Sequence, residues 1–312
     1  LERILEPNPA VFKDIDAPNP GDWIHEHKEP AETFSDFAAR KDGRLGQGKN
    51  VVYILPLGTF DSDSPPLPVL REYCRRFFCL PVVVLDAQCC NPPLSTISKN
   101  SKVTTVQFPT RDRSQSIALL AGDLMRVANA WRERDTHSII AFTMTDLYPA
   151  ENWNFVFGAL ALKELLGQAG DRTGVFSFAR YSPAFYRDKY VFHALQCSTS
   201  LTADDRALLL RRSCRVMVHE IAHMFGLGHC VYFSCCMNGA NSLSEDDRQP
   251  SHLCPVCLHK LLKATTCSPL ERYILLMDFC AAGAMSTGGS RQLVLQAFTV
   301  EREWLATRLR LL

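Results

Sequence analysis

This chain has no long apolar run and no low-complexity segment, and its net charge is close to zero. No stretch approaches the roughly 20 apolar residues that span a bilayer, so no membrane-spanning segment is expected. The first 20 residues lack the apolar core of a signal peptide. The formal net charge at pH 7 is only +1, and no basic stripe interleaved with aromatics is present, so nucleic acid is not an expected partner. No internal repeat is visible, which excludes a repeat array.

The composition is that of an ordinary folded protein. The 312 residues are 46% hydrophobic and 21% charged, which excludes disordered and fibrous classes. The chain also has 13 cysteines, and five of them lie between Cys230 and Cys257. In a reducing compartment such a cluster indicates metal binding before disulfides. We therefore expect the protein in the cytoplasm. We also expect a monomer, and the nucleus is a second expected location.

Local patterns predict an extension followed by alternating strands and helices. Residues 1–49 are rich in proline and charge with little periodicity, so we expect an extension and not a domain. From residue 50 onwards the rhythm is that of a mixed or parallel sheet with covering helices. Strands are expected at 51–58, 80–87, 137–148 and 174–181, and helices at 68–78, 115–134, 203–225, 268–281 and 291–309.

The segment HEIAHMFGLGH (219–229) contains the first candidate metal site. His219 and His223 are four residues apart, so on a helix they share a face at a separation that suits two imidazoles on one Zn²⁺. His229 can join them only if the helix ends, and Gly226 permits the positive-φ cap that ends it. Three imidazoles leave one zinc position open, as catalytic sites do. Glu220 lies beside them as a candidate general base.

Four cysteines form the second candidate site. Cys230 and Cys235 are followed by Cys254 and Cys257 of the CPVC segment. This spacing is typical of tetrahedral thiolate sites, and four sulfurs leave no position for substrate. The sequence therefore predicts a structural zinc site directly after the third histidine.

Other residues near this site leave alternatives open. Cys236 is an alternative ligand to Cys235. His252 and His259 flank the CPVC segment and are also alternative ligands, although we expect them to face solvent. Five of the cysteines outside the cluster are expected to be small buried hydrophobic side chains, namely Cys74, Cys79, Cys214, Cys267 and Cys280.

The joint pattern resembles the archaemetzincins, which are zinc metalloproteases of the metzincin clan. The resemblance is carried by HEIAHMFGLGHC with the downstream CPVC, which together give H-E-x-x-H-x-x-G-x-x-H and four cysteines. TMTDLYPAENWNFVFG (143–158) and GVFSFARY (174–181) resemble the animal members. The match extends through most of residues 50–280.

The resemblance implies a fold and a division of the chain. The fold is α+β, close to α/β, with a twisted mixed sheet, an active-site helix and a smaller C-terminal subdomain that holds a second zinc. The catalytic domain is expected at 50–312, with an upper subdomain at about 50–228 and a lower one at about 229–312. The strand at 174–181 is expected at the sheet edge, where extended substrate pairs with it.

The resemblance also implies roles for the site residues. His219, His223 and His229 hold a catalytic zinc, Glu220 is the general base, and Met237 forms the Met-turn. A second zinc on the four cysteines gives two Zn²⁺ per chain. The implied activity is hydrolysis of peptides by zinc-activated water, with aminopeptidase-like action on short peptides.

Two further function classes remain open from the residues. A non-catalytic two-zinc scaffold or peptide-binding module would keep the metals, but it has no use for the carboxylate of Glu220. A zinc-finger-like nucleic-acid binder would use the four cysteines, but the near-neutral charge disfavours it.

Overall fold

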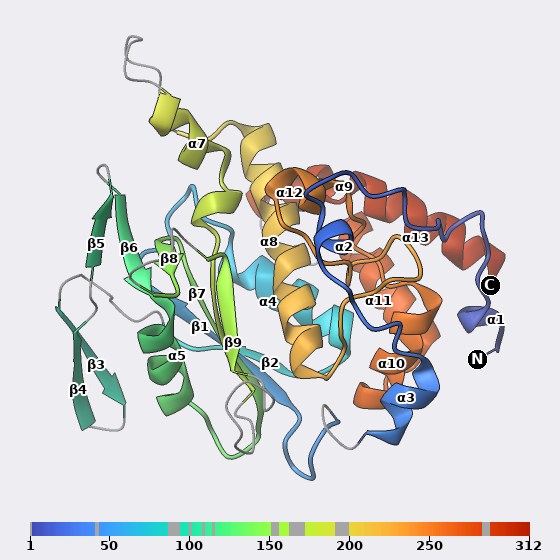
Figure 1. Ribbon diagram of the computed structural model, residues 1–312, viewed down its shortest axis with the longest axis horizontal. Helices are drawn as coiled ribbons and strands as arrows, with labels where there is room; N and C mark the ends of the chain where they lie inside the picture. Colours follow the sequence, from blue (N-terminus) through green and yellow to red (C-terminus); the bar gives the residue numbers. More distant parts are fainter. Residues whose placement is uncertain are drawn as a thin grey trace. The chain divides into compact units, whose positions relative to one another are not determined.

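The chain folds as two compact units. The computed structural model describes residues 2–40, 44–86, 94–99, 102–107, 110–113, 116–150, 156–161, 172–190, 200–282 and 288–312 (Figure 1). The helical unit comprises Leu1–Leu45, Glu72–Leu80 and Cys214–Leu312, and the sheet unit comprises Gly46–Arg71 and Pro81–Ser213. Helices α4 (Leu67–Phe78) and α8 (Ala203–Met224) contribute residues to both units.

The sheet unit contains all the strands in the described part of the chain. Its elements are β1 (Val51–Leu57), β2 (Val82–Val84), β3 (Leu94–Lys99), β4 (Lys102–Gln107), β5 (Thr110–Arg113), β6 (Ser116–Leu120), α5 (Ala121–Ala130), β7 (Thr136–Thr143), β8 (Asp146–Tyr148), β9 (Gly158–Ala161), β10 (Thr173–Ser177), the 3-10 turn η1 (Ala179–Tyr181) and α7 (Pro183–Tyr190).

The main sheet is mixed, as expected, with the order β2-β1-β7-β10-β9. Neighbouring strands are parallel except for β9, which runs antiparallel to β10. Strands β1, β7 and β10 are buried along their whole length, which is typical of parallel strands covered on both faces. The expectation that residues 174–181 form an edge strand was wrong, because β10 pairs with a strand on each side and β9 is the edge.

Three predicted elements differ clearly from the observed ones. The strand expected at 137–148 is two strands, β7 and β8, which belong to different sheets. The helix expected at 115–134 begins at Ala121, because residues 116–120 pair with β5 and β8 as a strand. The helix expected at 291–309 is two helices that meet at Phe298. Apolar spacing does not separate a short buried strand from a helix turn, nor does it show where one helix replaces another.

The helical unit is built from short helices at both ends of the chain. They are α1 (Glu2–Leu5), α2 (Trp23–Glu26), α3 (Phe34–Ala39), α9 (Leu243–Arg248), α10 (Pro255–Thr265), α11 (Pro269–Ala282), α12 (Gly288–Ala297) and α13 (Thr299–Leu311). Figure 1 shows α1 and α3 beside α10, with which both are in contact.

The N-terminal residues are packed into the helical unit. Phe12 and Phe37 are 3% and 2% exposed. The indole of Trp304 donates a hydrogen bond to the carbonyl of Val11 at 2.8 Å, and Lys260 donates to the carbonyl of Glu32 at 2.7 Å. The described residues before Gly46 thus pack with the C-terminal helices, and the proposed boundary at residue 49 stays a prediction.

Cys79 and Cys267 form a disulfide, so the expectation that both are buried free cysteines was wrong. The pair joins the end of α4 to the start of α11, and it is separated by 188 residues. Arg272 supports the same junction, because it donates to the carbonyl of Phe77 at 2.7 Å and lies over its ring. The other three, Cys74, Cys214 and Cys280, are buried free cysteines as expected.

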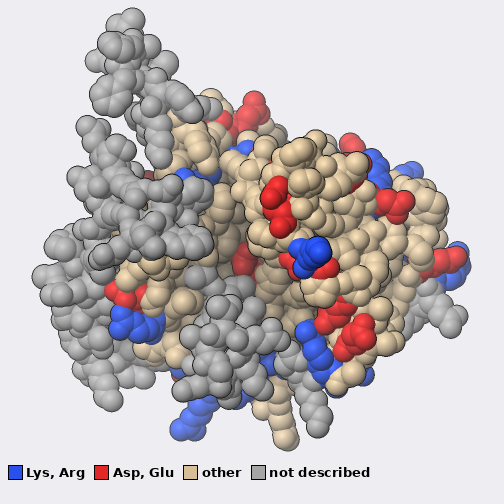
Figure 2. All heavy atoms as spheres, in the orientation of Figure 1, with Lys and Arg blue, Asp and Glu red and all other residues tan. Residues whose placement is uncertain are grey.

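The described surface carries charges of both signs. Figure 2 shows basic and acidic side chains interspersed on the displayed face, in line with the net charge of +1. Among the described residues, no helix is long and apolar enough to cross a bilayer.

Candidate metal centres

Helix α8 begins and ends as its sequence predicts. At its start the Thr202 hydroxyl accepts from the Asp205 amide at 3.1 Å, and the Asp205 carboxylate accepts from the Thr202 amide at 3.0 Å. This reciprocal pair is a capping box. At its end Gly226 has φ +84°, and the amides of Gly226 and Leu227 donate to the carbonyls of His223 and Ala222. That is a Schellman turn, which requires a left-handed residue.

This turn brings three histidines together. His219 and His223 project from one face of α8, and His229 follows the turn. One ring nitrogen from each lies within 4.8 Å of the others. His219 is 9% exposed, and the other two are partly buried. The sequence-predicted ligand set is therefore assembled.

Each imidazole uses its Nδ1 atom for a hydrogen bond to oxygen. His219 Nδ1 lies 2.8 Å from the carbonyl of Cys236, and His223 Nδ1 lies 2.7 Å from the carbonyl of Leu227. His229 Nδ1 lies 2.7 Å from a carboxylate oxygen of Glu29. Because these oxygens only accept, every Nδ1 carries the proton and donates it. The Nε2 atoms are left as acceptors, which is the tautomer that metal-binding histidines adopt.

The Nε2 atoms fit a cation. Those of His219 and His223 face each other at 2.9 Å, and two lone pairs at that distance repel unless a positive charge lies between them. Burial, together with neighbouring histidine charge, lowers the pKa of His219 and brings that of His223 to about 4. Both rings are therefore neutral at pH 7, and the donor set is suited to Zn²⁺.

Glu220 lies next to His219 on α8, outside the three-histidine group. Its side chain is half-buried. Desolvation raises its pKa to about 8, and the charge of Arg215 opposes this rise. A divalent cation beside it would favour the ionised form.

Glu29 was not predicted as a site residue, and it is 200 residues from His229 in the chain. Burial raises its pKa, but hydrogen bonds from His229 and Trp23 outweigh this effect and lower the pKa overall. Glu29 falls in the expected extension, where one acidic residue among many carries no local signal. Only the folded chain brings it to the site.

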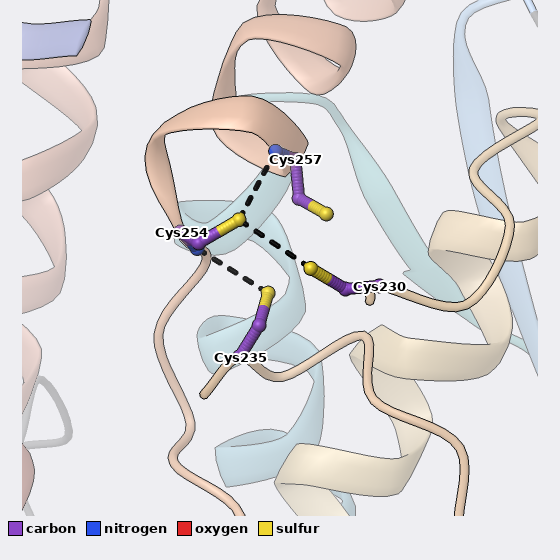
Figure 3. A group of neighbouring side chains, drawn as sticks. All are labelled: Cys230, Cys235, Cys254 and Cys257. Carbon is purple, nitrogen blue, oxygen red and sulfur yellow. Dashed lines mark hydrogen bonds between the residues drawn. The ribbon is translucent and has the colours of Figure 1, made fainter. Parts of the chain in front are cut away.

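The four-cysteine group is also assembled. The sulfurs of Cys230, Cys235, Cys254 and Cys257 lie within 4.8 Å of one another, and all four residues are buried. Figure 3 shows the four side chains pointing toward a common centre, two of them from the start of α10. Cys230 and Cys254 have their sulfurs 3.6 Å apart, close to the roughly 3.8 Å of two thiolates on one tetrahedral zinc.

Backbone amides complete the surroundings of this group. The amides of Met237 and Cys254 donate to the sulfur of Cys235 at 3.4 and 3.3 Å. The amide of Cys257 donates to the sulfur of Cys254 at 3.4 Å. Such bonds stabilise charged sulfur, so the group fits a closed zinc site.

The positions of Cys236, His252 and His259 place all three outside the four-cysteine group. Cys235 belongs to the group and Cys236 does not; Cys236 instead presents its carbonyl to His219. His252 stacks on Trp304 with ring centroids 3.8 Å apart, and His259 stacks on Phe34 at 3.4 Å. Both histidines lie against aromatic rings outside the ligand set, where we had expected them to face solvent.

Buried hydrogen bonds hold Met237 and the residues that follow it. Sequence patterns do not predict these bonds. Met237 is fully buried, and its carbonyl accepts from the Cys230 amide at 2.7 Å. Gln249 donates to the carbonyl of Gly239 at 2.7 Å and accepts from Arg215 at 2.9 Å. Arg215 lies one helical turn before His219, so α8 supports the turn that follows the cysteines.

Comparison with known proteins gives one family. Residues 178–263 match the model for Peptidase family M54. The chain is 31% identical over 307 residues to Archaemetzincin-2 of Homo sapiens, covering 93% of this chain and 80% of that protein. It is 30% identical over 332 residues to Archaemetzincin-2 of Rattus norvegicus, covering 98% of this chain and 88% of that protein.

A solved structure is also similar. It is the archaemetzincin of Archaeoglobus fulgidus, with 24% identity and a TM-score of 0.43, which covers 67% of this chain and 99% of that chain.

Proposed function

The chain belongs to the archaemetzincins, a family of zinc metallopeptidases, and from this membership we propose that it removes residues from the amino end of short peptides. Peptides are the substrates of such an enzyme. The amino-end preference and the role of each site residue are our proposal, and the monomeric state and cytoplasmic location stay predictions.

One observation carries the assignment of the reaction site. Three Nε2 acceptors converge, while each Nδ1 is committed to an oxygen. We assign His219, His223 and His229 to the catalytic zinc and the four cysteines to a structural one. When bound at the histidines, zinc supplies Lewis acidity, which acidifies water and polarises a peptide carbonyl. No fourth His, Cys, Asp or Glu joins the histidines among the described residues, and we propose that water and substrate take the remaining zinc position.

Glu220 is our candidate for the general base. It adjoins a ligand on α8 but belongs to neither ligand group. We propose that its carboxylate takes the proton of the attacking water and passes it to the leaving amine. Proton transfer of this kind is typically worth about 10²- to 10⁴-fold in rate.

The first prediction tests both parts by mass spectrometry. Zinc-loaded protein is incubated with a set of short peptides, each with a free and with an acetylated amino end. Amino-end trimming predicts stepwise loss of residues from the free peptides and none from their acetylated partners. Glu220→Ala should keep both zinc ions and lose turnover by at least about 10²-fold. Glu271→Ala, an exposed glutamate on α11, is the matched control and should cut like the parent.

Three other outcomes of this experiment would contradict parts of the proposal. Equal cleavage of acetylated peptides, at internal bonds, would reject amino-end trimming. Unchanged turnover in Glu220→Ala would remove this carboxylate from the mechanism. A fully zinc-loaded parent chain that cuts nothing would favour the non-catalytic two-zinc scaffold.

A further inference from the structure

The third histidine differs from the other two in what holds it. His219 and His223 donate to backbone carbonyls of Cys236 and Leu227, which side-chain substitution does not remove. His229 donates to a side chain, the carboxylate of Glu29, at 2.7 Å. Its orientation therefore depends on a residue in the N-terminal part of the chain.

Glu29 is itself held in place. The indole nitrogen of Trp23 donates to the same oxygen, Glu29 Oε1, at 2.6 Å. The Trp23 ring meets the His229 ring edge-on, with centroids 4.8 Å apart. Only 18% of the Glu29 side chain and 19% of the His229 side chain are exposed. Water therefore competes weakly for these charge-assisted hydrogen bonds, which are stronger than neutral ones.

Two further contacts fix the segment from Asp22 to Glu29 against the α9 region. The backbone amide of Trp23 donates to Glu245 at 2.8 Å, and Arg248 pairs with Asp22 at 2.7 Å. These contacts lie within one compact unit.

Gly239, two residues after Met237, gives the indole its space. A Cβ atom at Gly239 would lie 2.3 Å from the Trp23 ring, a distance that no side chain tolerates. The turn after the cysteines is therefore shaped to receive Trp23 from the N-terminal segment.

We propose that Glu29, held by Trp23, is a positioning residue for the catalytic zinc. It fixes the Nδ1–H tautomer of His229 and orients the ring so that Nε2 faces the other two ligands. Removing a carboxylate that accepts a hydrogen bond from a metal-binding imidazole typically weakens metal affinity by about 10- to 100-fold. The inference rests on the proposed role of the three histidines, and it makes the N-terminal segment a part of the active centre.

The test measures metal binding without any substrate. Zinc affinity of the three-histidine site is determined by chelator competition, with zinc at the four cysteines as the internal reference. We expect Glu29→Ala to weaken the three-histidine site about 10- to 100-fold. Glu29→Gln should lose less, because its amide oxygen still accepts from Nδ1. Trp23→Phe, which keeps a ring but removes the indole donor, should also lose less.

Glu26→Gln is the matched control. Glu26 lies in the same segment and pairs with His25, an exposed histidine outside both ligand groups. The zinc affinity of the Glu26→Gln protein should therefore equal that of the parent. With Co²⁺ reloaded at the three-histidine site, the visible spectrum should shift in Glu29→Ala and stay unchanged in Glu26→Gln. A shift reports changed ligand geometry, which a general loss of stability does not produce.

Two results would overturn the proposal. One is Glu29→Ala with zinc affinity within about twofold of the parent and an unchanged cobalt spectrum. The other is equal loss of zinc from both sites, which would show that Glu29 only supports the fold. If Glu29→Ala does not fold, Glu29→Gln and Trp23→Phe decide: weaker zinc binding at the histidines in either supports the proposal, and parent-like zinc affinity and cobalt spectra in both overturn it. Because this test uses no peptide, its result can be interpreted even if the proposed peptidase activity is not found.

Discussion

At the scale of single residues, Gly226 controls the three-histidine geometry. Its φ of +84° forms the turn that ends α8 at Met224. The Leu227 amide then donates to the carbonyl of Ala222 at 3.2 Å, and the Leu227 carbonyl accepts from the ring of His223 at 2.7 Å. The turn thus redirects the chain toward His229 and also supplies the acceptor that fixes the tautomer of His223.

The second prediction compares two nearby glycines. Gly226→Ala forces an L-residue into the left-handed region, which costs about 1–2 kcal/mol, and we expect weaker zinc binding at the three histidines. A Cβ atom on Gly228 meets nothing within 4 Å, and its φ is not left-handed. Gly228→Ala should therefore change stability by no more than about 0.5 kcal/mol. Denaturant titration of the two variants measures their stability, and metal analysis measures their zinc content. Equal stability of Gly226→Ala and Gly228→Ala would contradict the proposed role of the turn.

At the scale of elements, the segment from His229 to Cys257 links the two metal centres. His229 and Cys230 are sequence neighbours, and the Cys236 amide donates to the carbonyl of His252 at 2.8 Å. Glu29 and Trp23, from the N-terminal part of the chain, contact His229 as well.

The third prediction concerns this link. Cys254→Ser or Cys257→Ser removes a ligand from the closed site, where zinc contributes directly to folding free energy. We expect a lower melting temperature and loss of the four-cysteine zinc. Affinity at the three histidines should fall by less than about tenfold, because the bond to Glu29 remains.

Cys214→Ala is the control for these variants, since Cys214 is a buried free cysteine on α8 outside both ligand groups. It should keep both metals. Zinc titration and melting of the three variants side by side give the answer. Full zinc affinity at the histidines in both CPVC variants would mean that the two centres are independent.

At the scale of the whole molecule, one compact unit contains both metal centres and the N-terminal segment. The four cysteines form a closed, buried group, whereas two of the three histidines, His223 and His229, are partly exposed. The two sites should therefore differ in how readily a chelator removes their metal.

The fourth prediction follows from this difference. Mild chelation should remove one zinc of two and abolish peptide hydrolysis, while the circular dichroism spectrum is retained. Strong chelation should remove the second zinc and lower the melting temperature, because closed structural sites contribute to folding. Metal analysis and melting at each step provide the measurement. A single zinc per fully loaded chain would contradict the two-site assignment.

Local sequence predicted most elements near the sites and missed what distant segments supply. Helix α8 was correct to within one residue at its end, because its capping box and Gly226 are local signals. The strand at 116–120 was missed, since its hydrogen bonds run to other strands. The place of β10 in the sheet was also wrong, because strand order is set by pairing between segments far apart in the chain.

The sequence by itself predicted the candidate ligands of both metal groups, with Cys236 left open as an alternative to Cys235. Their spacing lies within one helix, one turn and one short motif, where covalent geometry already limits where side chains point. Only the tertiary structure decided that Cys235 and not Cys236 joins the thiolates, and that Glu29 holds His229. The reason is physical: hydrogen bonds and packing across 200 residues depend on the whole chain being folded, and no local pattern encodes them.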